Sequence, residues 1–266
     1  MNRWLGDAYR PDNPAGLLFP LIAAVMLIVV NQVLQYFSAI GLGPLLFGAE
    51  SLETRAGMKA ALVGILPVSL LTVLLALVLA RATGCDPRKV LALRGPGLSV
   101  PRWVGTVLLF LSAMYAFIML IVLALGLDIN DYTPGPDGAS PDSGSAGLVK
   151  ETMYDIANEP WLFWLVLPSV VIGAPLAEEF VFRGHAFAAL RNSKAGPLGA
   201  VLVTSSVWAL LHSTEPWLSI GLIFGMGIAL GLLLLRYGSI WVTVACHGVW
   251  NGIFALVTFG AASATP

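Results

Sequence analysis

The residues that could do chemistry gather in three short segments of the C-terminal half of the chain. They are ionisable or hydrogen-bonding side chains inside or beside apolar runs: Glu178, Glu179, Arg183 and His185 in APLAEEFVFRGH, Trp208 and His212 in SSVWALLHS, and His247 and Asn251 in SIWVTVACHGVWNG. Ionisable groups at membrane depth are rare, normally face the protein interior and mark functional sites. All three histidines of the chain lie in these segments. The segments are therefore the candidates for a reaction centre.

Helical spacing separates the two adjacent carboxylates. Glu179 and Arg183 are four residues apart with the acid first, which is the better orientation for an ion pair on one helix face. Glu178 points about 100° away from that face and has no equally natural partner in its own helix. We therefore expect Glu179 to be the structural carboxylate and Glu178 the free one.

The other two segments repeat the four-residue spacing. His247 and Asn251 would project two hydrogen-bonding side chains towards one spot, and Trp208 would form an aromatic wall beside His212. A free carboxylate close to a histidine can take a proton from water. A histidine N–H and an amide N–H aimed at one position can stabilise an oxyanion. Together these groups would supply the two parts that amide hydrolysis needs.

Each group also has a structural explanation when it is taken alone. Glu–Arg pairs often hold membrane helices together, and a single His or Asn commonly forms a hydrogen bond between helices. We expect a structural role for His185, which follows Arg183 and Gly184 at the expected membrane edge. Three segments that all carry such groups favour a functional site.

At these residues the chain resembles the CAAX-protease and bacteriocin-processing family of membrane endopeptidases, which includes the type II CAAX prenyl proteases. The order and spacing of three family motifs match over Pro175–Gly252. They are EExxxR at Glu178–Arg183 followed by Gly184, FxxxH at Trp208–His212 with Trp in place of Phe, and HxxxN at His247–Asn251 preceded by Gly238-Ser239-Ile240-Trp241.

The resemblance implies a glutamic endopeptidase with about eight helices and no metal or other cofactor. By this resemblance Glu178, with His212, activates water, while His247 and Asn251 form the oxyanion site. The same comparison makes Glu179 and Arg183 supporting residues, and Trp208 shapes the pocket. The implied partner is a protein or peptide substrate, prenylated or otherwise anchored in the lipid bilayer.

Other mechanisms and functions stay open at this point. The sequence contains no HExxH, GxGD or GxSG motif of other membrane proteases. A zinc site built from Glu178, His212 and His247 is chemically feasible, because three protein ligands and a water suffice. Buried Glu and His could also form the relay of a proton-coupled transporter. A third alternative is a non-catalytic scaffold or immunity protein.

The composition indicates that these segments belong to an all-α, polytopic membrane protein. Hydrophobic residues make up 58% of the chain and charged residues 11%, against about 25% charged residues in soluble proteins. The net charge of −1 gives no basic surface for nucleic acid. Cys85 and Cys246 are expected to be unpaired.

Seven apolar runs are long enough, or nearly so, to cross a bilayer. They are Leu17–Leu42, Gly57–Ala80, Trp103–Leu127, Trp161–Ala177, Gly196–Leu211, Trp217–Leu235 and Ser239–Phe259. The predicted fold is a bundle of seven to eight helices in one integral domain of the cell membrane. Residues 1–160 would form three helices and two long loops, and residues 161–266 would carry the motifs.

The two long loops differ in charge. Loop Arg81–Arg102 is basic and should lie in the cytoplasm, whereas Asp128–Pro160 is acidic, rich in Gly, Pro and Ser, and should be flexible and outside. The N-terminus is then cytoplasmic.

This topology leaves the depths of the catalytic groups in conflict. If Trp161–Ala177 runs inward and ends there, Glu178 lies at the cytoplasmic end, about 24 Å from His212. A turn near Gly173–Pro175 followed by a re-entrant helix Leu176–Arg191 would bring them together and give eight helices. Tilt and kinks in a seven-helix bundle are the alternative. We favour the re-entrant helix.

Overall fold

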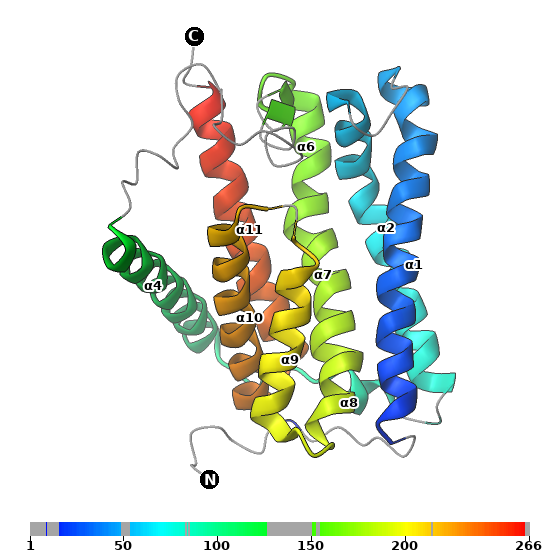
Figure 1. Cartoon of the computed structure of the whole chain (residues 1–266), viewed down its shortest axis with the longest axis vertical. Coiled ribbons are helices and arrows are strands. Elements are labelled where there is room, and N and C mark those ends of the chain that lie inside the picture. Colours follow the sequence, from blue (N-terminus) through cyan, green and yellow to red (C-terminus); the bar gives the residue numbers. More distant parts are fainter. Residues whose placement is uncertain are drawn as a thin grey trace.

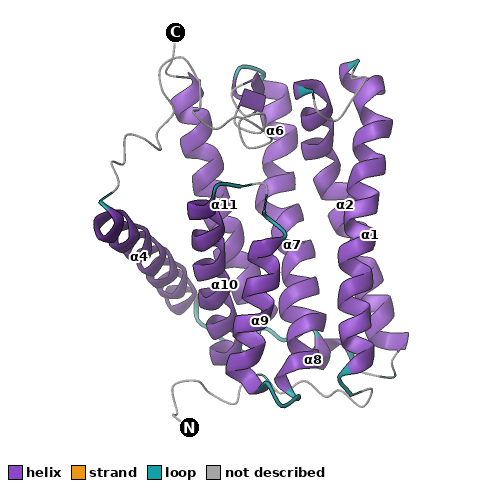
Figure 2. Ribbon diagram, viewed as in Figure 1, coloured by secondary structure: helices purple, strands orange, loops and turns teal. Residues whose placement is uncertain are grey.

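A computed structural model describes residues 9, 16–48, 54–82, 84, 86–126, 151–152, 155–213 and 215–263. Its described residues form helices and connecting turns without a strand (Figure 2). The helices, with η marking π-helical turns, are α1 Leu18–Leu42, η2 Gly43–Phe47, α2 Arg55–Ala82, α3 Pro87–Val90, α4 Val100–Leu125, α6 Pro160–Pro168, η4 Ser169–Gly173, α7 Ala174–Glu179, η5 Phe180–Ala186, α8 Phe187–Arg191, α9 Gly196–Leu210, α10 Trp217–Tyr237 and α11 Ile240–Ser263.

Six of the helical runs are long and apolar enough to cross a membrane. They are Leu18–Phe47, Arg55–Ala82, Val100–Leu125, Pro160–Arg191, Trp217–Tyr237 and Ile240–Gly260, while α9 is a shorter apolar helix. Apolar side chains on these helices are exposed in quantity, as is expected of surfaces that face lipid. The prediction of an all-helical integral membrane bundle is confirmed.

The predicted turn at Gly173–Pro175 and the re-entrant helix are wrong. Elements α6 to α8 form one continuous helical run, Pro160–Arg191, which descends the whole bundle (Figure 1). Pro175 does not break this run because it follows a π-helical turn, η4. In such a turn the backbone N–H groups donate to carbonyls five residues back instead of four. The helix therefore continues through the predicted turn.

The continuous helix also removes the conflict of depths. Glu178 lies thirteen residues before Arg191, where the run ends, and His212 lies sixteen residues after Gly196, where antiparallel α9 begins. At 1.5 Å per residue these positions are about 20 Å and about 24 Å from the shared turn. The conflict came from ending the helix at Ala177, which placed Glu178 at a membrane edge.

Most of the described basic residues belong to elements or turns at one end of the bundle, the lower end in Figure 1. This end holds the end of α2, the segment containing α3, the start of α4, the turn between α8 and α9, and the end of α10. Its basic residues are Arg81, Arg88, Lys89, Arg94, Arg102, Arg191, Lys194 and Arg236. We call it the basic end.

The opposite end has a different charge pattern. There Arg55 and Lys59 of α2 are paired with the acidic residues Glu151, Asp155 and Glu159. Most of the predicted acidic loop, residues 127–150 and 153–154, lies outside the described residues, as does Cys85. Cys246 is buried and free.

The basic loop is docked against α11 by three hydrogen bonds. Ile240 N donates to the Ala92 carbonyl at 2.9 Å, Trp241 Nε1 to Leu93 at 3.1 Å, and Ser239 Oγ to Arg94 at 2.6 Å. The Ser-Ile-Trp sequence before the third motif therefore has a structural role. It ties the basic loop to the helix that carries His247.

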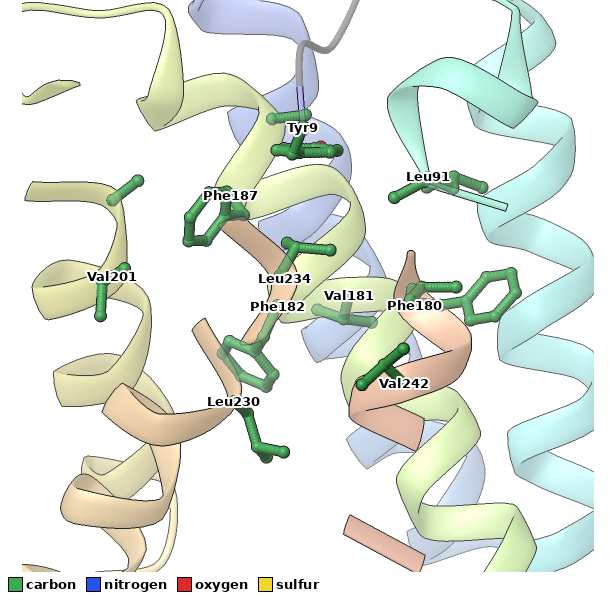
Figure 3. Packing of buried hydrophobic residues seen from close by; sticks show 14 of the residues in the cluster. Tyr9, Leu91, Phe180, Val181, Phe182, Phe187, Val201, Leu230, Leu234 and Val242 are labelled. Atoms are coloured by element: carbon green, nitrogen blue, oxygen red, sulfur yellow. The ribbon is translucent and has the colours of Figure 1, made fainter. Parts of the chain in front are cut away.

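The buried apolar cluster beneath the site joins this loop to η5 and α8. Figure 3 shows Leu91 close to Phe180, and Tyr9 beside Phe187, with ring centroids 5.7 Å apart. Tyr9 Oη donates to the Val90 carbonyl at 2.8 Å. Gly184 permits the close approach, because a Cβ there would lie 2.8 Å from Leu91 Cδ2.

Candidate active site

The two adjacent carboxylates lie in different surroundings, as the helical spacing predicted. Glu179 is fully buried, and its Oε1 accepts from Arg183 Nη1 at 3.1 Å. Arg183 is equally buried; its Nη2 donates to the Gly227 carbonyl at 3.1 Å, and its guanidinium lies 4.6 Å from the centroid of the Trp208 ring. This buried pair joins the 160–191 run to α9 and α10.

Glu178 faces a cavity. Its side chain is 28% exposed, and its Oε2 accepts a hydrogen bond from Trp208 Nε1 at 2.6 Å. His247 Nε2 lies 3.9 Å from the same oxygen. The indole N–H was not foreseen as a partner of Glu178, because phenylalanine, the usual residue of this motif, has no such donor.

His247 links the two carboxylates. Its Nδ1 lies 3.1 Å from Glu179 Oε1, while its Nε2 is directed towards Glu178. A histidine whose Nδ1–H donates to a carboxylate has its tautomer and ring orientation fixed. Glu179 therefore supports His247 as well as Arg183, a relation that spacing within one helix could not reveal.

His212 lies just beyond α9 and lines the same cavity as Glu178. Its Nδ1 is 2.9 Å from the Trp208 carbonyl, which must be the acceptor. In the neutral tautomer that this bond requires, Nε2 is the acceptor nitrogen. Its ring meets the Trp208 ring edge-on, with the centroids 5.6 Å apart.

Asn251 contacts the backbone of the 160–191 run. Its Nδ2 donates to the Val170 carbonyl at 3.1 Å. At the end of η4 the Ala174 N–H donates to the Ser169 carbonyl, five residues back. In the same pattern the Val170 carbonyl would accept from residue 175, but Pro175 has no N–H. Asn251 supplies the donor that Pro175 lacks.

The cavity has a volume of about 340 Å³ and lies between α1, α2, the α7–η5 segment and the end of α9. It extends to Met58, three residues from the start of α2 at the end opposite the basic end. The short helix α9 stops at mid-depth in Figure 1. Besides Glu178, Trp208 and His212, the polar residues of the cavity include Asn31, Gln32 and Gln35 of α1. Sequence reasoning missed these carboxamides, although three in one apolar span were a visible signal.

The zinc alternative requires three donors around one point. Within the described part of the chain, no three His, Cys, Asp or Glu side chains are grouped so that they could hold a metal ion. Nδ1 of His247 lies against Glu179 and Nδ1 of His212 against a carbonyl, so the Nε2 atom of each histidine is the nitrogen that could bind a metal ion.

Comparison with known proteins shows a similarity between the segment that holds these residues and one family. The family model described as Rce1-like, type II CAAX prenyl endopeptidase, matches residues 160–253, which contain all three motifs. No curated protein and no solved structure matched the chain. The match supports assignment of the segment that holds the site to the class of membrane proteases, hydrolases of the CAAX type.

Proposed function

We propose that the protein is a glutamic-type intramembrane endopeptidase that cleaves a membrane-associated or C-terminally anchored protein. One observation carries this proposal. Of two adjacent carboxylates, Glu179 is buried on Arg183, and Glu178 faces a cavity with Trp208 and His247 as neighbours. Such an arrangement suits one structural carboxylate and one general base.

In this mechanism Glu178 takes a proton from a water molecule, whose oxygen attacks the scissile carbonyl carbon. His212, across the cavity, holds the water through its free ring nitrogen. The resulting oxyanion accepts hydrogen bonds from Nε2–H of His247, which in this step carries a proton on each ring nitrogen, and from the second amide N–H of Asn251. When the C–N bond breaks, Glu178 returns the proton to the leaving amine. The products are a carboxylate and an amine, and no covalent enzyme intermediate forms.

Electrostatics support an orientation for the enzyme. Lys and Arg near the ends of membrane helices accumulate on the cytoplasmic side. The basic end includes Arg191 and Lys194, which lie where the continuous 160–191 run ends and turns into α9. We assign the basic end, and with it the N-terminus, to the cytoplasm.

The test is cleavage by purified protein in lipid vesicles. The probes are a farnesylated peptide ending in a CAAX sequence and the same peptide without the lipid, with products identified by mass spectrometry. Wild-type protein should release the C-terminal fragment, and Glu178→Gln should not. Glu151→Gln is the matched control, because Glu151 is an exposed partner of Arg55 and is absent from the lining of the cavity. Leader peptides and C-terminal sorting tails are the other substrate classes to be tried.

A cellular measurement complements this assay. Comparison of protein termini in cells with and without the protein should reveal precursors that accumulate unprocessed in its absence. If neither probe is cleaved and no precursor accumulates, the transporter and scaffold alternatives replace the proposal.

A further inference from the structure

Three carboxamides lie in the middle of α1, a helix otherwise dominated by apolar residues. They are Asn31, Gln32 and Gln35, and all three line the cavity that also contains Glu178 and His212. Gln32 is fourteen residues from the start of α1 at the basic end, about 21 Å at 1.5 Å per residue. Glu178 is about 20 Å from the same end. The carboxamides and the candidate base are therefore at the same depth.

One of the three carboxamides has a structural partner. Asn31 Nδ2 donates to Thr72 Oγ1 of α2 at 2.9 Å, and Thr72 in turn donates to the Val68 carbonyl at 2.9 Å. These bonds tie α1 to α2. Gln32 and Gln35, in contrast, form no side-chain hydrogen bond with any described residue.

Gln32 is exposed and Gln35 is half-buried, and both line the cavity. At membrane depth the polar groups of such amides need water or a ligand as partner, because hydrocarbon offers none. Each carboxamide offers donors and an acceptor, which matches the N–H and C=O groups of a peptide backbone in extended form. The surrounding wall is apolar, with Leu62 and Ile65 from α2 and Val181 from η5, so it can receive apolar side chains of the same peptide.

We infer that Gln32 and Gln35 bind the backbone of the substrate peptide, holding it extended across the cavity from Glu178 and His212. This inference rests on the proposed function. It also identifies a contribution of the N-terminal half, since α1 lies outside the segment that matches the family. The family segment supplies the hydrolytic groups, and α1 supplies the groups that hold this chain's own substrate.

The test uses Gln32→Met, Gln35→Met and the double variant, because methionine keeps the length of glutamine and lacks its donors. Phe37→Leu is the matched control, since Phe37 is on the same helix and is 63% exposed on its apolar surface. The substrate is the farnesylated CAAX peptide in lipid vesicles. The double variant should raise KM about tenfold and leave kcat within about twofold, because backbone binding is equal in the ground state and transition state. The control should change neither.

Thermal unfolding in detergent gives a second readout that does not depend on turnover. Removal of two unpartnered amides should leave the melting temperature of the empty protein unchanged or higher, whereas Asn31→Leu should lower it by breaking the bond to Thr72. A lower melting temperature in the double variant would show that the glutamines are structural and would overturn the inference. An unchanged KM in the double variant, or a loss confined to kcat, would also overturn the inference about the glutamines. Cleavage by the wild-type protein would still support the proposed function in that case. Absence of cleavage by the wild type, together with no accumulated precursor in cells, would instead remove the proposed function.

Discussion

Trp208 contacts most of the candidate catalytic side chains. Its indole N–H donates to Glu178, its ring lies under the Arg183 guanidinium, and the rings of His212 and His247 pack edge-on against it. A phenylalanine, the family's usual residue here, would keep a ring but lose the donor. Trp208 therefore positions Glu178 in a way that the usual motif residue cannot.

We predict that Trp208→Phe lowers kcat about tenfold without abolishing cleavage. The lost bond is to a charged acceptor, and such bonds contribute about 1.5–3 kcal/mol, of which about 1.4 kcal/mol already corresponds to tenfold. Steady-state kinetics on the peptide probe gives the measurement, and thermal unfolding should show little change. Complete inactivity of a well-folded Trp208→Phe protein would mean that the indole has a larger role.

The two carboxylates should respond differently to the same substitution. Glu178→Gln should fold normally and lose cleavage by about 10²–10⁴, the usual contribution of a general base. Glu179→Gln should lower stability by about 3–5 kcal/mol, because it leaves the Arg183 charge buried without its counter-charge. Protein yield, thermal unfolding and kcat of both variants are compared. If both fold well and only Glu179→Gln is inactive, the roles are reversed.

At the scale of elements, α11 and the π-helical turn η4 approach each other closely at Gly248. A Cβ at Gly248 would lie 2.6 Å from the Val171 carbonyl oxygen. The oxygen belongs to backbone and cannot rotate away. Gly248 thus allows α11 to approach closely enough for His247 to reach Glu179 and for Asn251 to reach Val170.

Gly248→Ala should therefore move α11 away from the 160–191 run. We expect a loss of about 1–3 kcal/mol in stability, as for other overpacked sites, and a larger loss of kcat than of affinity because His247 is displaced. Gly260→Ala, on the same helix with open space around its Cβ position, is the matched control. Equal kinetics in the two variants would show that the contact does not position His247.

At the scale of the whole molecule, the unequal charge of the two ends predicts the topology. In a background lacking Cys85 and Cys246, Lys194→Cys should react with a membrane-impermeant thiol reagent only from the cytoplasmic side. Met58→Cys, in the cavity near the opposite end, should react only from the other side. Labelling of intact cells tests access from outside, and labelling of inverted vesicles tests access from the cytoplasmic side. The reverse pattern would invert the assigned orientation and open the cavity to the cytoplasm.

Metal dependence is also a property of the purified protein as a whole. We predict that EDTA and 1,10-phenanthroline change cleavage by less than about twofold, because Glu178 acts directly on water and N–H donors stabilise the oxyanion. Metal content is measured on the same active sample. Stoichiometric zinc, with activity lost on chelation and restored by added zinc, would replace the glutamic mechanism by the zinc alternative.

The sequence by itself determined the helical membrane class, the Glu179–Arg183 pair and the exposure of Glu178 rather than Glu179. These features depend on local quantities, namely the hydropathy of single runs and the angle between neighbours on one helix. It also indicated the three segments that meet at the site, because charged groups at membrane depth are conspicuous in any apolar chain.

Only the tertiary structure decided how those segments meet. The continuity of Pro160–Arg191 depends on a π-helical turn that precedes Pro175, and Asn251 of a distant helix supplies the donor that this proline lacks. The contact of His247 with Glu179 and the cavity shared by Gln32 and Glu178 likewise join residues far apart in the chain. Periodicity describes one helix at a time, whereas depth and partnership are set by how the helices pack against one another.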